Sequence, residues 1–219
     1  MLNSQYDVVS FAVLIAGLSL IPLLIMTSTS FLKISLVLVV LRNAIGVQQM
    51  PPTMAIYGMA LVMTAFIMAP TAQEVAKRAA NIEHRPSASR TTPMLEHAQD
   101  VFEPIRQFMI RFSRPEQRDV FLDAAKKLWP KEIADEAKPT DTMIVFPAFV
   151  VSELQTGYEI GFLIYIPFVV IDLLIANLLM AMGMQQVSPQ TITVPLKILL
   201  FTLVEGWGKL LHALAMSYV

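Results

Sequence analysis

Three carboxylates inside the longest apolar stretch most constrain how this chain can fold. Residues 143–184 are nearly all apolar, yet Glu153, Glu159 and Asp172 lie among them. A charged side chain that faces lipid costs about 2.5–3.5 kcal/mol on insertion scales, so such residues face protein or a water-filled path. The sequence therefore predicts apolar helices that are surrounded by other protein.

The composition is that of an integral membrane protein. The chain has 219 residues, of which 55% are hydrophobic and 15% are charged, whereas soluble domains carry about 25% charged residues. Residues 74–141 contain twelve acidic and twelve basic residues, so a charged segment separates two apolar blocks. These charges are balanced, and no basic patch points to nucleic acid. The chain has no cysteine, which excludes disulfides and thiol chemistry.

The first apolar block is expected to form a helical hairpin. Its uncharged runs, 8–32 and 43–73, are longer than the ~20 residues that cross about 30 Å of hydrocarbon. As one straight helix the segment before the turn would be about 50 Å long, so a kink or break is expected. Ser30 is a candidate side-chain cap for a second helix that begins at Phe31.

The second apolar block is also expected to form a hairpin. Pro147 and Pro167 are expected to interrupt its first segment, and a turn over 183–189 precedes a final helix over 194–214. Apolar residues at i, i+3 and i+4 spacing predict that the charged segment is helical. The fold class is therefore an all-α membrane protein, in which two kinked helical hairpins flank a small helical extracytoplasmic domain. In chain order these parts are 1–72, 73–141 and 142–219.

Basic residues near the hairpin tips favour one orientation in the membrane. Arg42 lies at the turn of the first hairpin, and Lys197 follows the turn of the second. Because Lys and Arg are enriched in cytoplasmic loops, we expect the tips to face the cytoplasm. The charged domain and both termini would then lie on the opposite side.

The buried carboxylates do not share one helix face. On an ideal helix Glu153, Glu159 and Asp172 lie at about 0°, 240° and 100°. A single ion path would prefer one stripe, so we interpret them as charges that fix packing, with basic partners in the same or a neighbouring subunit. An ion-coupled carrier that uses these carboxylates as a proton site is the alternative. The predicted subunit-interface charges are Lys33, Arg42, Glu153, Glu159, Asp172 and Lys197.

The turn after the long apolar stretch is rich in methionine and glutamine. Methionine is flexible and polarizable, so it can seal an irregular gap and re-pack around different surfaces. Ordinary packing is the competing interpretation, because 14 methionines are spread through the chain. The predicted pore gate consists of Met180, Met182, Met184, Gln185 and Gln186.

No residue pattern in the chain is typical of an enzyme. The histidines, His84, His97 and His212, have no metal-ligand spacing. The metalloprotease, hydrolase, P-loop and dinucleotide fingerprints are absent from the sequence. We therefore predict a protein that is not an enzyme and has no cofactor and no metal site.

Two groups of short motifs resemble the FliP/SctR family, also called YscR/HrcR-type proteins. The first group is FLKI at 31–34 and LRNAIGVQQMPP at 41–52. The second group follows the charged segment: VSEL at 151–154, IGFLIYIPF at 160–168, VID at 170–172, GM at 183–184, PLK at 195–197 and GW at 206–207. These motifs occur in order over both apolar blocks, whereas the charged segment matches by position and size.

The resemblance implies an inner-membrane component of the type III secretion export apparatus, as in flagella and injectisomes. In this family five copies assemble with two smaller membrane proteins into a ring that admits unfolded export substrates. The charged domain would be periplasmic. Many members have three methionines in the gate loop, whereas this chain has Gln185 and Gln186 after Met184. The resemblance thus implies a mixed Met/Gln constriction, and the motifs at 163–167 and 187–189 favour the injectisome branch.

Overall fold

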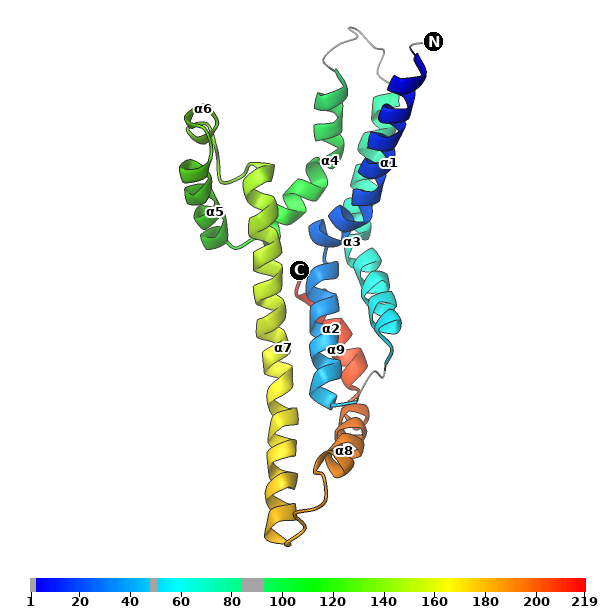
Figure 1. Cartoon of the computed structure of the whole chain (residues 1–219), viewed down its shortest axis with the longest axis vertical. Helices are drawn as coiled ribbons and strands as arrows, with labels where there is room; N and C mark the ends of the chain where they lie inside the picture. Colours follow the sequence, from blue (N-terminus) through cyan, green and yellow to red (C-terminus); the bar gives the residue numbers. More distant parts are fainter. Residues whose placement is uncertain (1–2, 48–50, 84–92) are drawn as a thin grey trace.

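The chain folds into helices that run along one long axis (Figure 1). The computed structural model describes residues 3–47, 51–83 and 93–219, and it contains no strand within these ranges. The longest helix, α7, extends from the lower end of the view past the middle of the molecule, and the other elements pack against it or against one another. In chain order the helices are α1 (Asn3–Ser28), α2 (Phe31–Ile45), α3 (Thr53–Glu83), α4 (Pro93–Phe112), α5 (Pro115–Leu128), α6 (Lys131–Ala134), α7 (Thr142–Ala181), α8 (Gln190–Leu203) and α9 (Gly206–Met216).

The first segment breaks between α1 and α2, as the sequence predicts. The two helices bend by 70°, and α2 begins at Phe31. The expected side-chain cap is wrong, however, because the buried Ser30 hydroxyl has no hydrogen-bond partner within the described residues. The Ser30 backbone is already helical, at φ −66° and ψ −6°, whereas a capping side chain needs an extended backbone. Instead, the Phe31 amide donates to Thr29 Oγ1 at 3.4 Å.

The second block contains one uninterrupted helix where the sequence predicts breaks. Helix α7 has 40 residues and includes both Pro147 and Pro167, so its length is about 60 Å. Proline removes one backbone hydrogen bond, which helices in apolar surroundings tolerate when neighbouring groups compensate. The expectation that these prolines interrupt the segment is therefore wrong.

Helix α7 packs closely along α2. An added Cβ at Gly157 would lie 2.9 Å from Leu36 Cδ2, and one at Gly161 would lie 3.0 Å from Val40 Cγ1. These glycines thus allow the two helices to approach, as small residues do between membrane helices. A core cluster formed by α2, α3 and α9 consists of Phe31, Ile34, Val37, Leu38, Ile56, Ala60 and Leu214.

The last segment is broken where the sequence predicts one helix. Helices α8 and α9 bend by 63° at a junction where Glu205 adopts a left-handed backbone with φ 54°. At the next position only glycine fits, since a Cβ at Gly206 would collide with the Phe201 ring. The expectation of a single helix over 194–214 is therefore wrong.

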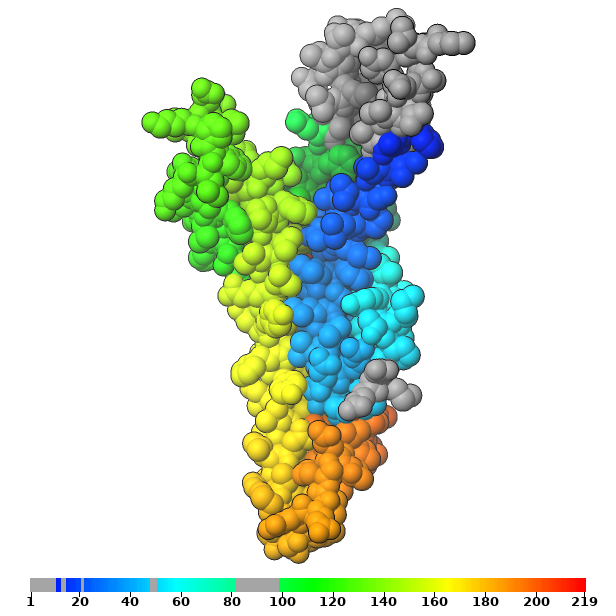
Figure 2. Space-filling model, viewed as in Figure 1, coloured from blue at the N-terminus to red at the C-terminus, as the bar shows by residue number. Residues whose placement is uncertain are grey.

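The charged segment shares a core with the apolar helices. Phe108 and Met109 of α4 pack with Met68 of α3, with Phe149 of α7 and with Tyr218 after α9. Helix α3 runs without interruption from the apolar block into the charged segment. Helices α5 and α6 instead project on the other side of α7 (Figures 1 and 2).

Among the residues that the structure describes, two helices are long and apolar enough to cross a membrane. They cover Thr53–Asn81 and Thr142–Ala181, and each bent pair, α1 with α2 and α8 with α9, adds a further span if it is counted as one. The all-α membrane fold class is confirmed.

Candidate functional site

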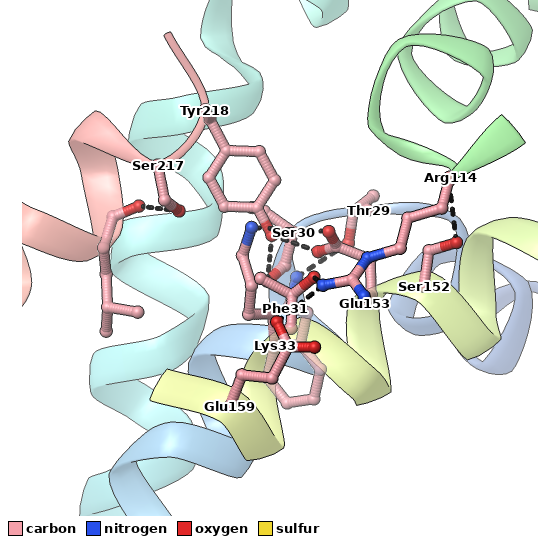
Figure 3. Close-up of polar contacts among 12 residues, drawn as sticks. Thr29, Ser30, Phe31, Lys33, Arg114, Ser152, Glu153, Glu159, Ser217 and Tyr218 are labelled. Carbon is pink, nitrogen blue, oxygen red and sulfur yellow. Dashed lines mark hydrogen bonds and ion pairs between the residues drawn. The ribbon is translucent and has the colours of Figure 1, made fainter. Parts of the chain in front are cut away.

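A buried ion pair joins α2 to α7. Lys33 Nζ lies 3.4 Å from Glu153 Oε1, and the two side chains are 3% and 2% exposed. The hydroxyl of Tyr218 donates to the other Glu153 oxygen, and Lys33 Nζ lies 3.6 Å from the centre of the Tyr218 ring. Figure 3 shows the three side chains converging between the helices. The carboxylate is therefore satisfied by two partners, which a buried charge requires.

Tyr218 brings the residues after α9 into this centre. Its ring stacks on Phe108 at a centroid distance of 5.9 Å and meets Phe112 edge-on at 4.9 Å. The guanidinium of Arg111 donates to the backbone oxygen of Val219 at 2.6 Å. The C-terminal residues thus connect α2, α4 and α7, and no sequence pattern indicates this role for Tyr218.

A second ion pair joins α7 to α8 and also reaches α2. Lys197 Nζ lies 2.6 Å from Asp172 Oδ2, and the lysine side chain is 3% exposed whereas the aspartate is 45% exposed. The same ammonium donates to the backbone oxygen of Ala44 at 3.1 Å. Ala44 is in the last turn of α2, where carbonyls have no partner within the helix. A cation is favourable there because it also interacts with the helix dipole.

The third carboxylate pairs with a residue of the charged segment. Arg114, between α4 and α5, places Nη2 2.6 Å from Glu159 Oε2. Its backbone amide donates to Ser152 Oγ at 2.9 Å, so this junction is fixed to α7 at two points (Figure 3). The hydrogen bond that Arg114 donates to Glu159 raises the pKa of the Arg114 guanidinium above its ordinary value. Sequence analysis does not identify Arg114, because it is one of many balanced charges.

Arg42 differs from the other five predicted charges. Its guanidinium donates to Thr53 Oγ1 at 3.0 Å, a bond that joins α2 to the start of α3. Within the part of the chain that the structure describes, no acidic side chain pairs with Arg42. The other five charges form ion pairs inside one copy of the chain, and their role between subunits stays a prediction.

The predicted gate residues lie where α7 turns into α8. Met180, Met182 and Met184 are 58%, 56% and 44% exposed, and Gln185 and Gln186 are exposed as well. Gly183, at φ 76°, reverses the chain, and the Met184 amide donates back to Leu179 O at 2.9 Å. Figure 2 shows this turn at the narrow end of the molecule. The five side chains are therefore brought together and left without a packing surface in one copy.

The arrangement offers no constellation for metal chemistry in the described part of the chain. No group of three or more His, Asp or Glu side chains there could hold an ion. His84 and the side chain of His97 are outside that part. The carboxylates of α7 lie in three separate ion pairs or networks, so each one stabilises a different helix contact.

Comparison with known proteins identifies the family. The model of the FliP family matches residues 14–214. The harpin secretion protein HrcR of Erwinia amylovora is 44% identical over 217 residues, which cover 99% of both chains. The Yop proteins translocation protein R of Yersinia pestis is 41% identical over 216 residues, which cover 97% of both chains.

A third relative has the same extent of similarity. The virulence protein YscR of Salmonella typhimurium is 43% identical over 201 residues, which cover 92% of both chains. The similarity in each case includes both apolar blocks and the charged segment between them. The chain belongs to the FliP family, in the branch whose members carry the names HrcR and YscR.

Proposed function

We propose that this chain is a structural pore subunit of a type III secretion export gate. Several copies, five by family resemblance, would form a ring with two smaller export-apparatus membrane proteins. The ring would pass unfolded secreted polypeptides through the bacterial inner membrane. Relatives with names from secretion and translocation support this role.

The exposed Met/Gln loop carries the proposal. In one copy of the chain Met182, Gln185 and Gln186 contact no core, although α7 holds them at its end. Copies that surround one axis would bring such loops together, and flexible thioether and amide side chains could close the opening. A loop of this composition would seal without selecting one substrate sequence.

The apolar surface of α7 supports assembly with further protein. Phe162, Leu163 and Leu174 are 66%, 68% and 63% exposed. The carboxylates of the same helix have partners inside the chain, so its remaining face is available for apolar contacts with lipid or neighbouring subunits. Contact with neighbouring copies, unlike contact with lipid, would also bring the Met/Gln loops of the copies together.

We further propose an orientation for the chain. The α7–α8 turn and the Arg42 end of α2 would face the cytoplasm, and the charged segment, 73–141, would be periplasmic. The basic residues at the tips support this orientation. Labelling of single cysteines at Lys126 and Gln185 with a membrane-impermeant thiol reagent would test it. Reaction at Gln185→Cys alone in intact cells would reverse the proposed orientation.

Native mass spectrometry of the full chain tests the ring. The chain should be extracted together with its two smaller partners as a complex that contains several copies. Detection of monomers alone, with both partners present, would contradict the proposal.

A carrier that acts alone is the alternative function. Proton-coupled uptake by the purified chain in liposomes would establish it. The separate partners of Glu153, Glu159 and Asp172 argue for structural roles, because a proton path would prefer aligned groups with access to water.

A further inference from the structure

Three charged side chains of the apolar blocks have no ion-pair partner among the described residues. They are Arg42, Glu205 and Lys209. The bond from Arg42 to the neutral Thr53 hydroxyl leaves the positive charge uncompensated. An ionisable residue in a membrane segment generally faces a partner or a polar path. The unpaired cation at the end of α2 and the unpaired anion of the α8–α9 junction are therefore available to partners from outside this copy.

The backbone conformation of Glu205 indicates that its carboxylate makes a contact. Its backbone is left-handed, with φ 54° and ψ 40°. Glycine adopts this conformation without the steric cost that a side chain adds. A junction that only reversed the chain would be easier to form with glycine there, as it is at Gly46 and Gly183. The exposed Glu205 side chain points to a contact that glycine could not make.

Arg42 and Glu205 lie beside the same core cluster. Leu41, next to Arg42, belongs to a cluster against which Phe201 and Trp207 pack, on the two sides of Glu205. Figure 1 shows the end of α2 and the α8–α9 junction at a similar height along the long axis. Rotation about an axis parallel to the molecule keeps such residues at one level, so different faces of two copies can meet there.

Both charges have apolar surface beside them. Beside Glu205 there is an almost wholly apolar groove of about 350 Å³, whose lining includes Gly206, Leu163 and Leu210, with Lys209 at its wall. Beside Arg42, the hydrogen-bonded start of α3 presents Met54 and Tyr57, which are 83% and 43% exposed. One face thus offers a cation with protruding apolar side chains, and the other offers an anion with an apolar recess.

We infer that Arg42 of one copy pairs with Glu205 of the next copy around the ring, while the first turns of its α3 cover the groove. The contact joins two different faces, so it can propagate from copy to copy, as the proposed ring requires. The inference rests on the proposed function and adds to it the residues that hold neighbouring subunits together.

Cysteine cross-linking tests the proximity of the two residues. The natural chain has no cysteine, so Arg42→Cys with Glu205→Cys introduces the only thiols of this chain. The full chain is expressed with its two smaller partners, and membranes are treated with a short bifunctional maleimide. We expect a ladder of cross-linked multimers. Arg42→Cys with Lys126→Cys, on the distant α5, should give none. Cross-linking within single chains, without a ladder, would overturn the inference.

Charge reversal tests the pairing itself. Arg42→Glu or Glu205→Arg alone should lower the yield of multimers by about ten-fold or more, and the double variant should restore it. Glu205→Arg with Lys209→Glu is the matched control, because these residues are one helical turn apart in the same chain. Restoration by that control, and not by the Arg42 double variant, would overturn the inference.

The ring and the contact between Arg42 and Glu205 can be tested separately. If native mass spectrometry shows multimers of the unmodified chain while the cysteine pair gives no ladder, the ring stands and this contact is wrong. If the unmodified chain is only monomeric beside its partners, the ring and the contact are both wrong.

Discussion

At the scale of single residues, the hydroxyl of Tyr218 contributes to stability in addition to the packing of its ring. It donates to Glu153, which is almost fully buried. Tyr218→Phe keeps the aromatic packing and removes this donor, so we expect a loss of about 1–3 kcal/mol of unfolding free energy. Denaturant titration of the purified complex in detergent measures it. Tyr158→Phe is the control, since that side chain is 59% exposed. Equal stability of both variants would contradict the role of the hydroxyl.

The carboxylates of α7 should also differ in their contribution to stability. Glu153→Ala leaves Lys33 buried without its anion, a change that costs about 3–5 kcal/mol in buried pairs. Glu159→Ala removes a partner that is 51% exposed, and solvent screening makes the contribution of such an exposed pair small. The yield of assembled complex, measured by native mass spectrometry, should fall for the first variant and remain for the second. A similar fall for both would show that burial does not set the effect.

At the scale of elements, α4 carries a pH-dependent contact. Arg106 donates to both oxygens of Glu103 at 2.7 Å and to Thr140 O, also at 2.7 Å, which ties α4 to the segment before α7. These bonds hold the pKa of Glu103 below its ordinary 4.5. The contribution to stability is therefore fully present above pH 4.5 and is lost as the pH falls through the lower folded value. The protection of α4 amides against hydrogen exchange, relative to their intrinsic rates, should fall below that pH, and Glu103→Gln should abolish the change.

The sequence predicts where helices occur better than it predicts where they are interrupted. The α1–α2 boundary follows from a polar run, whereas the continuity of α7 through Pro147 and Pro167 depends on the helices packed beside it. The α8–α9 break depends on the contact of Gly206 with Phe201, which local propensity does not contain. The same limit applies to the site: the charges within the apolar stretches can be identified from the sequence, but Tyr218 and Arg114 reach Glu153 and Glu159 only through tertiary packing.

At the scale of the whole molecule, charges and apolar surface have separate roles. Ion pairs inside the chain fix α2, α7 and α8 relative to one another. The remaining apolar faces and the uncompensated Arg42 and Glu205 are available to neighbours. The ion pairs thus stabilise the arrangement of helices within one copy, while the exposed apolar faces, Arg42 and Glu205 remain for contacts between copies. The proposed gate loop would then act only in the assembled state, because in one copy it closes nothing.

The gate loop gives a prediction that applies to the assembled complex. Replacing Met182, Met184, Gln185 and Gln186 together by Ala should raise ion conductance of the reconstituted complex above background, because small side chains cannot fill the opening. Met143→Ala is the control, since Met143 is 77% exposed at the opposite end of α7. Planar-bilayer recordings of the two variants measure the difference. Conductance at background for the loop variant, with the complex intact, would mean that another segment closes the pore. Conductance that rises only for the loop variant would assign the seal to these four side chains, glutamines included.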